Sequence, residues 1–302
     1  MNTLARLLLI TAGLLLSTAT TAQPEVSEVS DVEELKIAAL EALITAPADR
    51  ALPLVNKVLA GNNSVELKER ALFILSQIDQ PEAQDTLLRF ARDESGELQG
   101  EAIRMIGIGG NQEALAGLGP IYQTGDGEAR EAVLQAYLIA GDKQAMFNIA
   151  ANAENEADFE EAVDMLGAMG PRDELRELRS RAGMSDSLID AYAISGDFET
   201  LREIALDNSS ADLQAQAIEA LGLVNDDRVD TTLVEIYQGA TNDEVREAAL
   251  QGLMLSGHDA GILQLYRASD NSAEKKELLE YLVMMGSDEV WNIIDSALDS
   301  DQ

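Results

Sequence analysis

The sequence predicts an all-α fold, an α-solenoid of about nine two-helix repeats that stack into a curved superhelix. An apolar pattern recurs at intervals of 26 to 32 residues, which is the range of two-helix solenoid repeats. Each copy has the spacing of a helix, a turn and a second helix. No stretch shows the alternating, β-branched pattern of strands. We expect the solenoid to occupy residues 31–299.

Residues 1–22 have the pattern of a secretory signal peptide. One cation precedes an apolar run at 7–16, and the small residues of 17–22 follow, with cleavage expected after Ala22. The apolar run is too short to span a bilayer, which needs about 20 residues. A buried first helix is the alternative interpretation. The pattern predicts export, to the periplasm or, as the alternative, to the medium.

A polar linker is expected at 23–30, and a polar tail at 300–302. Between them the first helix of each repeat is defined by three aligned apolar positions, called 0, 1 and 4, which share one helix face. Position 0 is small or apolar: Ala39, Ala71, Ala102, Val133, Ala162, Leu188, Ala217, Ala249 and Leu278. Position 4 is large and apolar: Leu43, Leu75, Ile106, Tyr137, Leu166, Tyr192, Leu221, Leu253 and Leu282.

The turn after the first helix often contains Gly followed by Asp, as at Gly141 and Gly196. Gly permits the left-handed conformation that ends a helix, and Asp caps the next one. The second helix then places an apolar residue sixteen positions after position 0: Val55, Leu87, Leu118, Ile149, Leu178, Ile204, Leu233, Leu265 and Ile294. One hairpin cannot bury this stripe alone, so neighbouring hairpins must stack.

Several first helices also carry a start signal in which a capping residue precedes Glu by three positions. The pattern places helix caps at Ser30, Asn63, Thr241 and Asn271.

Residues 243–250 (DEVREAAL) and 127–133 (GEAREAV) resemble the first helix of the short HEAT-like repeats of bacterial proteins, a type also found in phycobilisome lyases. The resemblance covers about 31–299. It implies a scaffold that binds partners along a surface lined by the second helices, although a few such proteins act on bilins or damaged DNA. Tetratricopeptide repeats are the nearest rival, but their 34-residue period and signature are absent.

Composition excludes several classes of function. Acidic residues number 55 against 21 basic ones, a formal charge of -34, so we expect no nucleic-acid partner. With no Cys and one His, neither a zinc site nor a thiol or His-based catalytic group is expected. No stretch matches a calcium loop. We therefore expect no catalytic residues, no metal and no cofactor.

One group of cations departs from the general acidity. Arg172, Arg176 and Arg179 share a face of the fifth second helix, and alignment places Lys143 and Arg202 at equivalent positions of the neighbouring repeats. Together they predict a basic ridge that could bind an acidic peptide or an anionic ligand. The alternative is that neighbouring acids neutralise the ridge as ordinary surface pairs.

Four further side chains, three aromatic residues and the single His, are interpreted from their places in the repeat. Tyr122 and Tyr237 are expected to fill stacking gaps with their hydroxyls reaching water, the alternative being exposed partner anchors. Trp291 is interpreted as a packing residue of the last repeat, and His258 as a solvated turn residue.

The combined interpretation is a non-enzymatic, exported and monomeric scaffold that binds a protein along its solenoid surface. The alternative is a ligand-binding or bilin-lyase-like enzyme that holds an anionic group on the basic ridge. An enclosed pocket would favour the enzyme, and an open groove would favour the scaffold.

Overall fold

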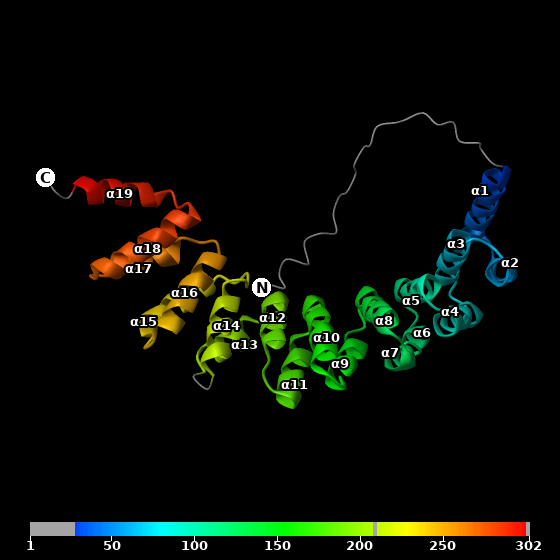
Figure 1. Cartoon of the computed structure of the whole chain (residues 1–302), viewed down its shortest axis with the longest axis horizontal. Helices are drawn as coiled ribbons and strands as arrows, with labels where there is room; N and C mark the ends of the chain where they lie inside the picture. The colour runs from blue at the N-terminus through cyan, green and yellow to red at the C-terminus, as the bar shows by residue number, and fades with distance from the viewer. Residues whose placement is uncertain (1–27, 208–209, 300–302) are drawn as a thin grey trace.

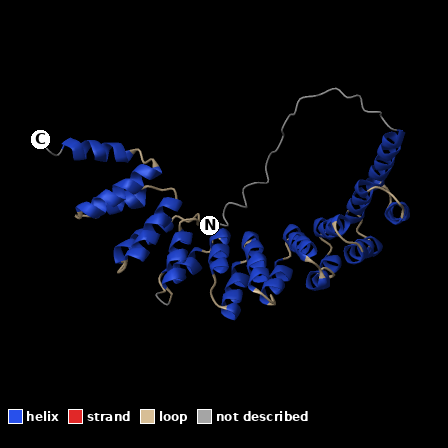
Figure 2. Ribbon diagram, viewed as in Figure 1, coloured by secondary structure: helices blue, strands red, loops and turns tan. Residues whose placement is uncertain are grey.

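A computed structural model describes residues 28–207 and 210–299. Within these ranges the chain contains helices joined by turns and no strand (Figure 2). The expected signal peptide at 1–22 and the tail at 300–302 lie outside the described residues. The first helix begins at Glu28, so the last three residues of the expected linker are helical.

The described helices form nine consecutive hairpins, which confirms the all-α repeat architecture. The first four hairpins are α1 (Glu28–Glu41) with η2 (Ala42–Thr45) and α2 (Ala48–Ala60); α3 (Val65–Ser76) and α4 (Pro81–Asp93); α5 (Glu97–Gly109) with α6 (Gln112–Ala116) and α7 (Gly119–Thr124); and α8 (Gly127–Ala140) and α9 (Lys143–Ala151). The next five are α10 (Glu156–Met169) and α11 (Arg172–Ala182); α12 (Asp186–Ser195) and α13 (Phe198–Ala205); α14 (Ala211–Leu221) and α15 (Val229–Gly239); α16 (Asp243–Leu255) and α17 (Ala260–Ala268); and α18 (Ser272–Met285) and α19 (Glu289–Asp299).

The hairpins stack side by side into a long arc (Figure 1). First helices such as α5, α8, α10, α12, α16 and α18 lie on the inner side of the arc, and second helices such as α4, α9, α11, α15 and α17 lie on the outer side. The inner surface of this solenoid is therefore built from first helices. The surface lined by second helices, which the resemblance implies as the binding surface, is the outer side of the arc.

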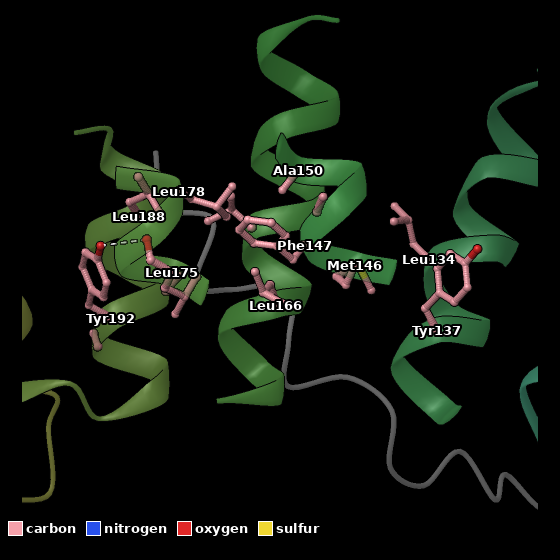
Figure 3. Packing of buried hydrophobic residues seen from close by; sticks show 14 of the residues in the cluster. Leu134, Tyr137, Met146, Phe147, Ala150, Leu166, Leu175, Leu178, Leu188 and Tyr192 are labelled. Carbon is pink, nitrogen blue, oxygen red and sulfur yellow. Dashed lines mark hydrogen bonds between the residues drawn. The ribbon is translucent and has the colours of Figure 1, made fainter. Parts of the chain in front are cut away.

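The buried residues confirm the repeat register. At position 4, every residue from Leu75 to Leu282 is at most 3% exposed. Figure 3 shows how the core continues between hairpins: Leu166 of α10 packs near Phe147 of α9 and Leu175 of α11. The Tyr192 hydroxyl donates to the Leu175 carbonyl at 3.1 Å. One apolar seam thus continues through the stack, because each hairpin covers the apolar stripe of the one before it.

Small residues let three pairs of first helices approach closely. A Cβ added at Gly222 of the seventh hairpin would lie 2.1 Å from the Gly252 carbonyl oxygen in the eighth. Gly107 and Gly167 stand at the same repeat position as Gly222. A Cβ added at Gly107 would lie 2.7 Å from the Ala136 backbone, and one added at Gly167 would lie 2.8 Å from the Ala191 backbone. Larger side chains here would force the hairpins apart, so these glycines determine the spacing of three joints.

Helix termini follow the expected turn chemistry. Gly141 and Gly196 adopt φ values of 70° and 69°, and the Asp142 and Asp197 side chains each accept a hydrogen bond from a backbone N–H of the following helix. The N-cap at Asn271 is confirmed.

Three expected caps are wrong. Ser64 and Asn242, one residue after the expected Asn63 and Thr241, provide the caps, and Ser30 lies within α1. In the first two cases the neighbouring residue is also a good cap, so the pattern alone did not choose between them.

The tryptophan of the ninth hairpin is not packed as expected. Trp291 is 67% exposed, so its interpretation as a packing residue is wrong. No further hairpin follows α19 among the described residues, and its outer face therefore has no neighbour to cover it. His258, with a side chain 71% exposed, lies in the turn before α17 as expected, where its Nδ1 is 3.5 Å from Asp230 Oδ2.

Candidate functional site

The basic ridge is built on α11, which carries Arg172, Arg176 and Arg179 on the side that faces the sixth hairpin. Arg176 donates from Nη2 to Asp197 Oδ1 at 2.7 Å and from Nε to Thr200 Oγ1 at 2.9 Å. The Asp197 side chain is only 1% exposed, because the turn at Gly196 holds it beneath the guanidinium. The hydrogen bond that Arg176 donates to Asp197 raises the pKa of Arg176. Arg176 therefore joins two hairpins.

The other two arginines of α11 also reach the sixth hairpin. Arg172 donates from Nε to the Ser195 carbonyl oxygen at 3.2 Å, and Arg179 Nη2 lies 3.3 Å from Glu203 Oε1. Since each guanidinium already has a partner, this part of the ridge connects the fifth hairpin to the sixth.

The remaining two members of the predicted ridge lie elsewhere. Lys143 is exposed at the first residue of α9. Arg202, exposed on α13, lines a separate open hollow of about 300 Å³ together with Thr232 and Glu235 of α15. The structure thus brings Arg172, Arg176 and Arg179 together against one hairpin and places Arg202 beside the next joint.

An open hollow of about 370 Å³ lies where the turns of the fifth, sixth and seventh hairpins meet. Its charged lining consists of Arg172, Arg176, Arg228, Asp197, Glu199 and Asp226, and its apolar lining includes Ile194, Phe198 and Leu223. The hollow therefore contains three cations and three carboxylates.

Arg228 is a member of this hollow that the sequence analysis missed. It forms ion pairs with Asp226 (2.8 Å) and Glu199, and its guanidinium lies 4.2 Å from the centre of the Phe198 ring. Hydrogen bonds from Arg228 lower the pKa of Asp226 to about 2. Its proximity to Asp226 in sequence was the only available signal. With its cations paired internally, the hollow presents little net charge to an anionic ligand.

The two aligned tyrosines are packing residues, as expected. Tyr237 is 4% exposed, and Tyr122 is half-buried with Arg130 5.8 Å from its ring centre. The expectation that the hydroxyl reaches water is wrong for Tyr122. Tyr237 donates to Glu274 Oε1 at 2.8 Å, and the Tyr122 hydroxyl is buried without a partner among the described residues. Burial raises the pKa of both.

The exposed face of the first helices carries an apolar row that sequence analysis also missed. It occupies one register position, six residues after position 0, near the end of each first helix. Its members are between 43% and 64% exposed: Ile108, Ile139, Ile194, Leu223, Leu255 and Met284. In the fifth hairpin, between Ile139 and Ile194, the position holds Ala168. The repeat alignment alone would have found this row.

An acidic row runs beside the apolar row from the fourth to the eighth hairpin. Its members lie one or two helical turns before the apolar-row residue of their hairpin, on the same helix face. Its members are Glu131, Glu160, Glu161, Asp164, Asp186, Asp190, Glu219 and Glu247. None of them forms an ion pair with a described residue.

The acids of this row are close enough to influence each other. Burial, followed by the charges of neighbouring acids, raises the pKa of Glu161, Asp164, Asp190 and Glu219. The first helices of these five hairpins contain two cations, Arg130 and Arg246, and both are already paired, with Asp158 and Asp243. The inner surface is thus acidic and apolar, with uncompensated negative charge.

Residues 28–207 and 210–299 contain neither a metal-ion cluster nor a membrane-spanning helix. No group of three or more His, Asp or Glu side chains there is placed to hold a metal ion. None of the helices in these ranges has both the length and the apolar character required to cross a bilayer.

Residues 52–137, from α2 to α8, match the family model of HEAT repeats. The hairpins on either side continue the same stack in the same register, so the chain has an all-α solenoid fold that includes HEAT repeats.

Two solved structures match the chain at low identity and low TM-score. The complex of CpcE and CpcF of phycocyanin lyase from Nostoc sp. PCC7120 has 19% identity over 94% of this chain and 99% of that chain, with a TM-score of 0.28. A chain from the computational design of self-assembling cyclic protein homooligomers has 12% identity over 88% and 99%, with a TM-score of 0.14. No curated protein matches the sequence.

Proposed function

We propose that this protein is a non-enzymatic scaffold that binds another protein along the inner surface of its solenoid. The observation that carries the proposal is the apolar row. Single exposed apolar residues are common on protein surfaces. Here, however, six recur at one register position of stacked hairpins, and stacking aligns them into a strip from the third hairpin to the ninth that Ala168 of the fifth hairpin interrupts.

The alternative of a ligand-binding or bilin-lyase-like enzyme has less support. It required a basic ridge free to hold an anionic group. Arg176 and Arg228 are instead paired with Asp197 and Asp226, and Arg172 donates to a backbone carbonyl. A ligand would have to displace these partners and leave the 1% exposed Asp197 carboxylate unpaired, which is costly.

A site-specific cross-linking experiment tests the scaffold proposal. A photoreactive residue would replace Ile194 on the inner surface or, as a control, Glu235 on the exposed side of α15, and each chain would be expressed in its native cell. We expect a discrete protein adduct from position 194 and none from position 235. Adducts at neither position, or equally at both, would contradict the proposal.

The proposal includes export, with action in the periplasm. Residues 1–22 support it through their signal-peptide pattern. Mass spectrometry of the protein isolated from cell fractions tests this step. We expect a mature chain that begins at Gln23 in the periplasmic fraction, whereas an intact amino terminus in the cytoplasm would contradict it.

A further inference from the structure

The apolar row and the acidic row together restrict the kind of segment that fits the inner surface. The two rows lie on the same face of α8 and α12, where the carboxylate of Asp190 precedes Ile194 by one helical turn. In the seventh hairpin, Glu219 of α14 precedes Leu223, which lies in the turn just after that helix. A partner that covers the apolar row must therefore also cover the acids, which have no cation beside them, whereas Arg172 and Arg228 in the hollow next to Ile194 and Leu223 already have partners. Burying unpaired carboxylates is unfavourable, so the partner must supply cations beside its own apolar residues.

The spacing of the hairpins restricts the partner further. Packed helices lie roughly 10 Å apart, so the register position of the apolar row recurs at about that interval from one hairpin to the next, with Ala168 occupying it between Ile139 and Ile194. An α-helix rises 1.5 Å per residue, and seven residues advance it by about 10.5 Å. A helix laid along the stack with an apolar residue in every heptad would thus meet one hairpin per heptad. About 20 residues would span roughly 30 Å, or three joints.

On these grounds we propose that the inner surface between the fourth and eighth hairpins is a docking site for a cationic amphipathic helix of a partner protein. Its apolar stripe lies on Ile139, Ile194 and Leu223, and its Lys or Arg residues pair with Asp164, Asp190, Glu219 and their neighbours. This inference rests on the proposed scaffold function and names the chemistry of the partner.

The charge of the protein argues against a second copy as the occupant. Two chains with a formal charge of -34 each repel, and an inner surface placed against its own copy would bring uncompensated acidic rows together. A cationic helix removes this repulsion. The raised carboxyl pKa values in the row indicate the same need for positive charge.

The test uses the mature chain, which contains the whole solenoid. Its ligand is a fluorescent helical peptide of about 20 residues, with Leu at heptad spacing and Lys beside each Leu. Two control peptides replace Lys by Glu or Leu by Ser. Fluorescence anisotropy at about 50 mM and about 300 mM salt measures Kd. We expect binding of the Lys-Leu peptide alone, with affinity that falls as salt rises.

Two sets of variants locate the binding surface. The row variant carries Ile139→Ser, Ile194→Ser and Leu223→Ser, and the acid variant carries Asp164→Asn, Asp190→Asn and Glu219→Gln. Matched controls change exposed residues elsewhere: Leu54→Ser with Leu206→Ser, and Glu82→Gln, Asp85→Asn with Glu235→Gln. Circular dichroism verifies that each variant is folded.

We expect the row and acid variants each to weaken binding at least about tenfold, and the control variants less than about threefold. The docking site would be overturned if the control variants lost as much affinity for the Lys-Leu peptide as the row and acid variants. It would also be overturned if the row variant bound the peptide as tightly as the wild-type protein. Binding of the Glu peptide would overturn its chemistry. If sedimentation velocity showed that the wild-type protein is a dimer and the row variant a monomer, the surface would instead be assigned to self-association. None of these results depends on the cellular cross-linking that tests the scaffold function.

Discussion

The Arg176 guanidinium of α11 holds the buried carboxylate of Asp197 across the joint between the fifth and sixth hairpins, with a 2.7 Å bond from Nη2 to Oδ1. Asp197 also accepts from the Thr200 hydroxyl at 2.8 Å. The ridge residue that the sequence marked as a ligand contact is therefore part of the stacking interface.

Replacing Arg176 should destabilise the solenoid. Arg176→Ala leaves a carboxylate that is 1% exposed without its cation, and we expect a loss of about 1–2 kcal/mol in the free energy of unfolding. The figure is modest because the arginine side chain is 44% exposed to water. Urea denaturation measures it. Lys276→Ala, which breaks an exposed pair with Glu280, should cost less than about 0.5 kcal/mol; an equal loss in both variants would contradict the assignment.

The close approach of α14 and α16 makes Gly222 sensitive to a single methyl group. Gly222→Ala would place Cβ 2.1 Å from the Gly252 carbonyl oxygen, so we expect destabilisation by about 1–3 kcal/mol or more. Gly100→Ala is the matched control. Gly100 lies within α5 with nothing within 4 Å of an added Cβ, and Ala there should stabilise by up to about 1 kcal/mol. Thermal midpoints that shift in the same direction would be inconsistent with this packing.

The register of the seventh hairpin is tested by two neighbouring leucines. Leu221 is fully buried, whereas Leu223 is 47% exposed. Leu221→Asp introduces an unpaired charge into the seam and should lower the free energy of unfolding by more than about 4 kcal/mol. Leu223→Asp should change it by less than about 0.5 kcal/mol. If the two variants had the same denaturation midpoint, the register would be wrong.

The crowded carboxylates predict a pH dependence. The pKa values of Asp164 and Asp190 are raised above the ordinary 3.8, first by burial and then by neighbouring acids. The folded state then binds more protons than the unfolded state just above pH 3.8, so ionisation of these groups opposes folding as pH rises. At pH 7, Asp164→Asn with Asp190→Asn should therefore stabilise the protein, by less than about 1 kcal/mol per site.

The gain from this double substitution should shrink as pH falls toward the ordinary carboxyl value, where the wild-type groups are already protonated. Thermal unfolding of both proteins between pH 4 and pH 7 measures the difference. Glu82→Gln with Asp85→Asn on α4 serves as a control. A constant difference across this range, or destabilisation at pH 7, would contradict the prediction.

Much of the fold was predictable from the sequence. The 26 to 32 residue period and the apolar face of each first helix depend on local spacing, and a helix places residues three and four apart on one face regardless of its neighbours. The caps were less certain, because adjacent residues such as Asn63 and Ser64 compete for the same role and packing selects one.

The candidate site was harder to predict. Sequence spacing correctly placed Arg172, Arg176 and Arg179 on one face of α11, but it did not show that Asp197, twenty-one residues after Arg176, lies beneath that face. The apolar row was visible only by comparing repeats, because a single Ile194 at the surface has no special meaning.

By itself, the sequence determined the hairpin unit, its number of copies and its negative charge, since these follow from local helical periodicity and composition. The tertiary structure alone decided which helices line the inner side of the arc, which cations are neutralised, and that Trp291 is exposed. These properties depend on the distance and angle between neighbouring hairpins, and contacts such as Gly222 against Gly252 determine that geometry through packing between residues far apart in the chain.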